Sequence, residues 1–134
     1  MPITLISASL LGLLLVYLSY AVTLVRRRPT HGHAESDGDD LNNAVRAHGN
    51  LIEYAPMMLI LIGLLEQMQH NFYVVAGLAG TFVLARYMHG LTFGKIDGFN
   101  RYRFMGTLLT FLTILIACIA GLVEAYQMMA MPSA

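Results

Sequence analysis

The sequence predicts an all-α protein, a membrane-spanning bundle of four helices, and three observations favour this fold class. Of the 134 residues, 57% are hydrophobic and 12% are charged, whereas soluble domains carry roughly 25% charged residues. Residues 1–25, 67–85 and 104–123 contain no Asp, Glu, Lys or Arg. A helix needs about 20 mostly apolar residues to cross about 30 Å of hydrocarbon, and each of these stretches approaches or exceeds that length. A fourth stretch, 42–65, is apolar apart from a few polar residues.

The first helix is predicted over about 3–25. It ends before Arg26-Arg27-Arg28-Pro29, where charge and proline both oppose continuation. We expect this helix to be retained, because it lacks the basic start of a secretory signal peptide and its apolar stretch is too long for one. The polar, acidic residues 29–40 that follow are predicted to form a loop.

The remaining helices are predicted over about 42–67, 72–93 and 103–127. Asp40 or Asn42 can cap the helix over 42–67, and a membrane helix tolerates a proline such as Pro56. The short turn 67–71 makes the next helix antiparallel to it, and 94–102 is predicted as a loop. Four helices of this length use nearly the whole chain, so residues 1–134 are predicted to form one domain.

Basic residues are placed on one side of this predicted bundle. The loops that join its first and second helices and its third and fourth hold six of them, Arg26, Arg27, Arg28, Lys95, Arg101 and Arg103. Cytoplasmic loops of membrane proteins are enriched in Lys and Arg, so both termini are predicted to lie outside the cytoplasm. The net charge is zero, so no overall field would recruit nucleic acid.

Polar residues within the spans are candidates for function, because ionisable groups are expensive in a bilayer. Arg46, Asn50 and Glu53 have i, i+4, i+7 spacing and share one helix face. At 1.5 Å per residue, Glu53 lies about 16 Å along its helix from Asn42, and Arg86 lies about 12 Å from Gly94. These two polar faces are therefore expected to meet at one depth, with Arg86 and His89 sharing the face of the third helix.

Two interpretations of this polar cluster are open. In the structural one, Glu53 pairs with Arg86 or Arg46 and the set fixes helix packing. In the functional one, Arg46, Arg86 and the nearby Arg103 leave surplus positive charge beside one carboxylate, which suits an anionic ligand. A guanidinium stays charged when buried and binds carboxylates through a planar fork.

A longer motif carries these residues. Residues 46–56, Arg-Ala-His-Gly-Asn-Leu-Ile-Glu-Tyr-Ala-Pro, resemble the R-A-x-x-N-x-x-E-x-x-P signature of the MAPEG family, membrane-associated proteins in eicosanoid and glutathione metabolism. Residues 85–89, Ala-Arg-Tyr-Met-His, together with Phe93, resemble that family's third helix. The resemblance covers the second to fourth helices in register, and the predicted length of the bundle agrees for the whole chain.

The resemblance implies a homotrimer that binds glutathione between neighbouring subunits in the cytoplasmic half of the bilayer. Carried over by position, the glutathione-binding residues are Arg46, Asn50, Glu53, Tyr54, Arg86 and His89. Arg103 matches the arginine that stabilises the thiolate, and Arg101 is its rival, because the loop over 94–102 is longer than in the eicosanoid enzymes. The pKa of a free thiol is about 8.5, and a neighbouring cation lowers it.

The chain departs from the eicosanoid enzymes at three positions. Gly49 stands where the prostaglandin-forming members have a further arginine, and His89 and Phe93 stand where the leukotriene-forming members have tyrosines. The resemblance therefore favours a prokaryotic type of member in a bacterial inner membrane.

The expected function is a membrane-bound glutathione-dependent transferase or peroxidase, with glutathione as thiol co-substrate and a lipophilic electrophile or hydroperoxide from the bilayer. The alternative is a non-enzymatic structural or accessory membrane protein. We expect no metal site. His48 and His89 at similar depth would suit axial haem ligands, but the charged residues around them would crowd a porphyrin.

Overall fold

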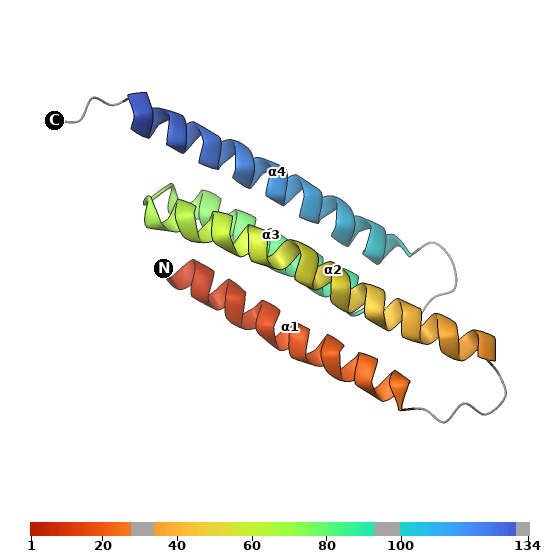
Figure 1. Cartoon of the computed structure of the whole chain (residues 1–134). Helices are drawn as coiled ribbons and strands as arrows, with labels where there is room; N and C mark the ends of the chain where they lie inside the picture. Colours follow the sequence, from red (N-terminus) through yellow and green to blue (C-terminus); the bar gives the residue numbers. More distant parts are fainter. Residues whose placement is uncertain (28–33, 93–99, 131–134) are drawn as a thin grey trace.

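The computed structural model describes residues 1–27, 34–92 and 100–130, with residues 34–39 described by their backbone alone. Four helices make up this part of the chain: α1 (Pro2–Arg26), α2 (Ala34–Gln67), α3 (Phe72–Gly90) and α4 (Arg101–Ala130). Successive helices run in opposite directions, so the start of α1 and the end of α4 lie at the same end of the bundle (Figure 1). The predicted all-α, four-helix fold is confirmed.

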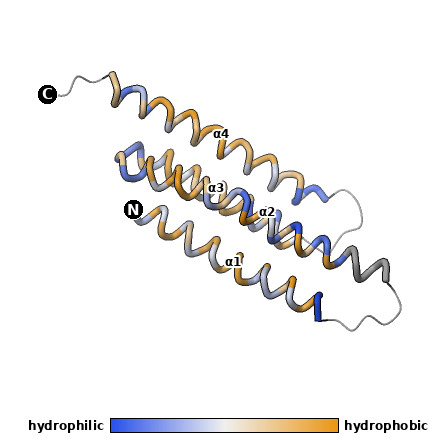
Figure 2. The backbone as a smooth tube through the Cα atoms, in the orientation of Figure 1, coloured by the Kyte–Doolittle hydropathy of each residue, from blue (hydrophilic) through white to orange (hydrophobic). Residues whose placement is uncertain are grey.

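Three of the described helical segments are long and apolar enough to cross a membrane: Pro2–Arg26, Asp40–Gln67 and Arg101–Ala130. The remaining helix, α3, has 19 residues, carries Arg86 and His89, and packs against all three other helices. Large apolar side chains on α1 and α4 face outward instead, and hydrophilic residues collect near the helix ends (Figure 2). An apolar exterior around a helix with buried charge is the arrangement of an integral membrane protein.

The boundaries of α2 and α3 differ from the predicted ones. Helix α2 begins at Ala34, so the loop predicted over 29–40 is helical from residue 34 onward. The acidic residues of this segment favour the positive N-terminal end of a helix, an effect that the loop prediction left out. Helix α3 ends at Gly90 rather than at 93, with Leu91 as its C-cap, and glycine is a poor helix former. Beyond this end, the hydroxyl of Thr92 donates hydrogen bonds to the carbonyls of Met88 and His89, both at 3.0 Å. Phe93 lies outside the described residues.

Helix α4 begins at Arg101 and ends at Ala130, rather than spanning 103–127. The side-chain oxygen of Asn100 accepts hydrogen bonds from the backbone N–H groups of Tyr102 at 2.9 Å and Arg103 at 3.4 Å. An asparagine in this geometry is an N-cap, which fixes the first turn of the helix. Arg103 therefore lies within the first turn of α4, and Arg101 opens the helix.

The packing core lies between α1, α2 and α3 and is built from large apolar side chains such as Leu14, Met58 and Phe82. Helix α4 packs against α3 differently, through a face of small residues with a spacing of three and four. The buried residues of this face are Gly106, Thr110, Thr113 and Ala117. Small side chains allow two helix backbones to approach closely, which is the usual means of packing helices in a membrane.

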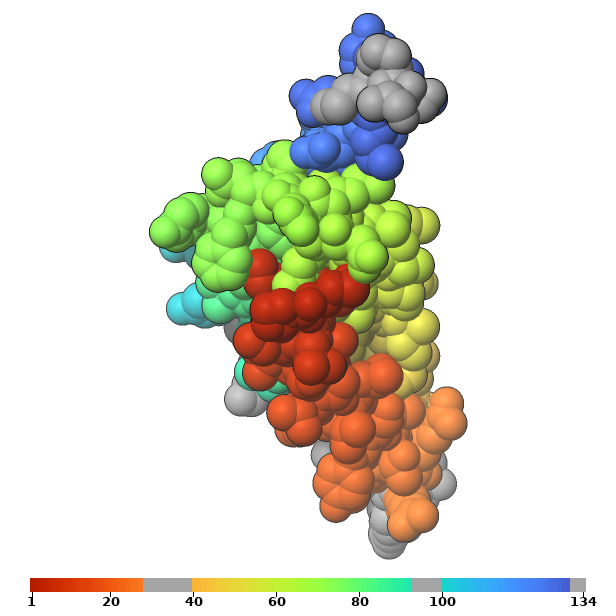
Figure 3. Space-filling model, turned by 90° about the vertical axis from the view of Figure 1, so that its left-hand side faces the viewer, coloured from red at the N-terminus to blue at the C-terminus, as the bar shows by residue number. Residues whose placement is uncertain are grey.

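Side-chain bonds tie the helix ends together at the end of the bundle that carries the start of α1. The carboxylate of Glu66, at the end of α2, accepts hydrogen bonds from the backbone N–H groups of Ile3 at 2.9 Å and Thr4 at 2.8 Å, and from the Thr4 hydroxyl at 2.6 Å. Figure 3 shows the start of α1 lying against the region where α2 turns into α3. Glu66 therefore acts as a cap for α1 that is contributed by another helix.

Candidate functional site

The centre of the predicted site is Arg86, whose side chain is only 2% exposed. It projects from α3 towards α2, where Nη1 donates hydrogen bonds to the backbone carbonyl of Asn50 at 3.3 Å and to the side-chain oxygen of the same residue. Within the described part of the chain, Arg86 forms no ion pair with a carboxylate, and its Nε has no hydrogen-bond acceptor. A buried cation is thus bound by neutral oxygen atoms and keeps one donor unused.

Aromatic rings enclose the Arg86 guanidinium. The ring centroids of Tyr54 and Phe82 lie 5.6 and 5.9 Å from its central carbon, within the range of a cation–π contact. Tyr54 also makes an edge-to-face contact with Phe111 of α4, with ring centroids 5.7 Å apart. Tyr54 of α2 and Phe82 of α3 therefore line the guanidinium, Phe111 of α4 supports Tyr54, and the two rings lower the cost of holding a charge away from water.

His89 lies one helical turn after Arg86 on the same face of α3 and is 6% exposed. It packs against Gly106 of α4, where the two helices meet at backbone distance. Arg103 is half-buried, whereas Arg101 is exposed. Of the two candidate arginines, Arg103 is therefore the one whose side chain is partly covered by the rest of the bundle.

The structure brings four of the predicted site residues together within one subunit, Asn50, Tyr54, Arg86 and His89, and places Arg103 on α4 one turn before Gly106, which meets His89. It turns Arg46 and Glu53 outward on α2, where both are exposed. Within the described residues neither of them takes part in an ion pair, so the pairing of Glu53 with Arg86 or Arg46 that the structural interpretation invoked is not present in a single chain. Charged side chains that face outward from a membrane helix need a polar partner or water.

The two histidines that would suit a haem have separate surroundings. The Nε2 atom of His48 lies 3.0 Å from the hydroxyl of Ser19 on α1, and that hydroxyl also donates to the Leu15 carbonyl at 2.8 Å. His89 is buried against α4 instead. His48 therefore takes part in the packing of α1 on α2.

Sequence reasoning missed three residues of this site. Phe82 lies against the guanidinium, and its i, i+4 spacing with Arg86 is the signal in the sequence that points to it. Asn100 fixes the first turn of α4 and so the place of Arg103. Gly106 has no signal in the sequence, because a glycine in an apolar run does not show which backbone it meets.

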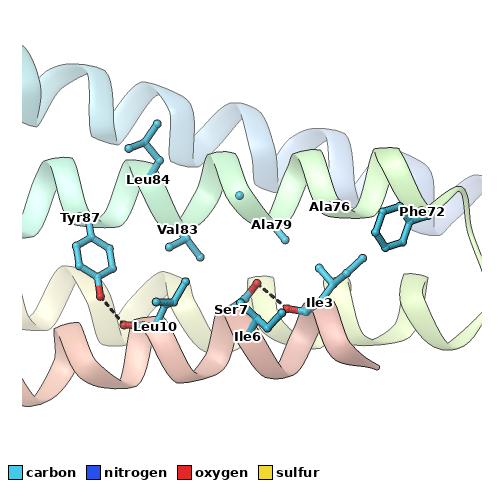
Figure 4. A pocket seen from close by; sticks show the side chains of 11 residues that line it. Ile3, Ile6, Ser7, Leu10, Phe72, Ala76, Ala79, Val83, Leu84 and Tyr87 are labelled. Atoms are coloured by element: carbon cyan, nitrogen blue, oxygen red, sulfur yellow. Dashed lines mark hydrogen bonds between the residues drawn. The ribbon is translucent and has the colours of Figure 1, made fainter.

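A separate apolar groove of about 640 Å³ lies between α1 and α3 (Figure 4). Its walls carry no charged side chain, and its two hydroxyl groups are already bound. The Tyr87 hydroxyl donates to the Leu10 carbonyl at 2.9 Å and the Ser7 hydroxyl to the Ile3 carbonyl at 2.9 Å. Exposed residues such as Ile6, Phe72 and Leu84 border the groove, so it belongs to the lipid-facing exterior and is distinct from the cluster around Arg86.

Comparisons with known proteins agree with the motif. The model of the MAPEG family matches residues 4–123. Two similar proteins are the inner membrane protein YecN of Escherichia coli strain K12 and the protein of the same name in E. coli O6:H1. Each is 29% identical over 116 residues, which is 86% of this chain and 86% of the relative. No solved structure matches the chain.

Proposed function

This chain belongs to the MAPEG family, and on that premise we propose that it is a membrane-bound glutathione-dependent transferase or peroxidase. Its second substrate would be a lipophilic electrophile or hydroperoxide that enters from the bilayer. The two similar proteins are named as inner membrane proteins, which supports the same location for this chain in a bacterial cell.

The observation that carries the proposal is the buried guanidinium of Arg86. Removing a cation from water is costly, and a buried charge is normally offset by a counter-ion. Within the described residues Arg86 has no carboxylate partner, and its Nε has no acceptor. Glutathione is an anion with two carboxylates and would supply the missing negative charge. The bond to Asn50 and the rings of Tyr54 and Phe82 would hold the guanidinium in place for it.

The chemistry requires the glutathione thiol to lose its proton. Arg103 lies in the first turn of α4, one turn before the contact of Gly106 with His89, where a guanidinium and the helix N-terminus both favour an anion. In the transferase reaction the thiolate sulfur bonds to an electrophilic carbon, and the leaving group departs with the bonding electron pair. In the peroxidase reaction two glutathione molecules are oxidised to a disulfide, while the hydroperoxide is reduced to an alcohol and water.

The proposal includes a homotrimer. Arg46 and Glu53 are exposed on α2, and in an isolated subunit both would face lipid. A neighbouring subunit that covers this face would bury both charges and bring them to the glutathione that we place beside Arg86. In such an assembly a single subunit would hold only part of the site. This agrees with the positions of the polar residues, some of which lie inside the subunit and others on its exterior.

One observation favours the second candidate, a non-enzymatic membrane protein. The bonds between Arg86 and Asn50 are complete within one chain and join α2 to α3 without any ligand. A polar contact of this kind can serve helix packing alone. In that case the protein would have no thiol chemistry, and Arg86 could be replaced by any residue that preserves the packing of α2 against α3.

A thiolate titration separates the two candidates. Detergent-purified protein is mixed with glutathione, and absorbance near the thiolate band is followed across a pH series. An enzyme of the proposed type raises the thiolate signal below the pH at which free glutathione ionises, and Arg86→Met abolishes the increase. Wild-type protein without any thiolate signal at saturating glutathione would leave the structural role as the better account.

A further inference from the structure

Gly106 occupies a position on α4 where no side chain fits. A Cβ atom there would lie 2.7 Å from the Ala85 carbonyl oxygen, 3.1 Å from the His89 backbone nitrogen and 3.2 Å from the His89 Cβ. These atoms belong to one turn of α3, and Arg86 lies between Ala85 and His89 in that turn. The close approach of α4 to α3 is therefore centred on the predicted glutathione-binding turn.

This contact cannot be relieved by rotating a side chain. Two of the three neighbouring atoms belong to the α3 backbone, and the third is a Cβ atom fixed to it. A methyl group at position 106 would have to move away until the 2.7 Å separation reached ordinary van der Waals contact of at least 3.4 Å. Because both helices are rigid at this point, α4 itself must shift relative to α3.

The shift would fall on Arg103. Arg103 lies one turn before Gly106 on the same side of α4, and the Thr107 hydroxyl binds its carbonyl at 3.0 Å. A methyl group at 106 would push against His89, so the first turn of α4, which carries Arg103, would move away from this part of α3. The bonds of Arg86 to Asn50 join α2 and α3 instead and would be left in place.

We propose that Gly106 is a positioning residue, whose missing side chain allows α4 to hold Arg103 close to the glutathione sulfur beside Arg86 and His89. This inference rests on the proposed function. A Coulombic interaction weakens with distance, so a small outward movement of a guanidinium reduces its stabilisation of a thiolate. Gly106 thereby sets how reactive the bound thiol is, while Arg86 and Asn50 set how well glutathione binds.

A matched control is available in the same helix. Gly121 also lies on α4, but a Cβ atom there would meet nothing within 4 Å. Gly121→Ala therefore makes the same chemical change, with the same gain in helix propensity, away from the α3 contact. Any difference between the two variants reports the contact at Gly106.

The experiment uses the full chain in detergent or nanodiscs, with glutathione as the probe. Wild type, Gly106→Ala, Gly121→Ala, Arg103→Ala and the double variant Gly106→Ala/Arg103→Ala are compared by thiolate absorbance against pH and by glutathione affinity. We expect Gly106→Ala to raise the pKa of the bound glutathione thiol towards that of the free thiol. The thiolate fraction at neutral pH should fall about threefold as a result. Its affinity for glutathione should change less than the thiolate fraction does, and Gly121→Ala should match wild type. In the Arg103→Ala background, Gly106→Ala should add no further shift.

Four other outcomes would contradict either this inference or the proposed function. A wild-type thiolate signal that Gly106→Ala leaves unchanged overturns this inference and spares the proposed function. Absence of the wild-type signal removes the proposed function, and this inference with it. Failure of Gly106→Ala to assemble while Gly121→Ala assembles overturns the positioning role, because the glycine would then serve packing as a whole. Additive shifts from Gly106→Ala and Arg103→Ala also contradict it, because Gly106 would then act by a route other than Arg103.

Discussion

Arg86 on α3 and Asn50 on α2 form a two-point contact, in which one guanidinium nitrogen donates to both the backbone carbonyl and the side-chain oxygen of Asn50. The contact joins the two polar segments of the sequence in the middle of an apolar bundle. It also leaves the Arg86 Nε without an acceptor in the described part of the chain. The pair is therefore both a packing contact and the base of the proposed anion site.

Removing the Asn50 side chain should destabilise the fold. Hydrogen bonds to charged groups contribute about 1.5–3 kcal/mol, and Asn50→Ala leaves a buried guanidinium with one acceptor fewer. We expect a loss of this order in thermal or denaturant unfolding in detergent. Asn42→Ala, at an exposed position of the same helix, is the control and should stay within about 0.5 kcal/mol of wild type. Equal stability of the two variants would mean that the Arg86–Asn50 contact does not hold α2 to α3.

Replacing Arg103 should affect the thiol more than the fold. Arg103 is half-buried in the first turn of α4, so Arg103→Ala removes little packing. We expect the pKa of the bound thiol to rise by about one unit. Conjugation of an aryl halide at pH 7 should then slow about tenfold, because less of the thiol is ionised. Arg101→Ala is the matched control, because Arg101 is exposed at the start of the same helix. If Arg101→Ala abolishes the thiolate signal and Arg103→Ala does not, the two arginines have been assigned in the wrong order.

Glu53 should matter for assembly. It is exposed on α2 and takes part in no ion pair within the described residues, so we expect a neighbouring subunit to supply its partner. Native mass spectrometry of wild-type protein at low detergent should show a trimer, and Glu53→Ala should shift the distribution towards monomer. Gln67→Ala, an exposed polar change at the end of the same helix, should leave the trimer intact. A wild-type monomer or dimer under these conditions argues against the homotrimer.

Orientation can be tested by labelling. The basic loops predict that Arg27 faces the cytoplasm and that Met129 lies outside it, and both side chains are exposed. In a Cys118→Ser background, a cysteine at position 129 should react with a membrane-impermeant maleimide in cells whose outer membrane has been opened, and a cysteine at position 27 should not. Both should react after the inner membrane is dissolved. The reverse labelling pattern would mean that the bundle has the opposite orientation in the membrane.

Glu66 should stabilise the start of α1. Its carboxylate accepts three hydrogen bonds from Ile3 and Thr4 and lies at the positive end of the helix. We expect Glu66→Ala to cost about 1–2 kcal/mol in unfolding, in the range of a lost N-cap. Glu66→Gln keeps one acceptor oxygen and should cost less. A thermal midpoint for Glu66→Ala equal to that of wild type would contradict a capping role for Glu66.

The sequence by itself determined the four helices, their order and their membrane character. A transmembrane helix satisfies its backbone within its own segment, so length and hydropathy are enough to predict it. The motif over 46–56 identified the family for the same reason, because its spacing along one helix is a local property. The start of α4 was less predictable, since it depends on a single side chain, Asn100, that binds the backbone.

Only the tertiary structure decided which way the polar residues face. Arg46, Asn50 and Glu53 share a face by spacing, yet packing against α3 turns Asn50 inward to Arg86 and leaves the other two exposed. The closeness of Gly106 to Ala85 and His89 was equally absent from the sequence, because it is set by the backbone of another helix. Helical periodicity fixes which residues lie together on one helix, whereas the distance and rotation between helices are fixed by the side chains that pack between them.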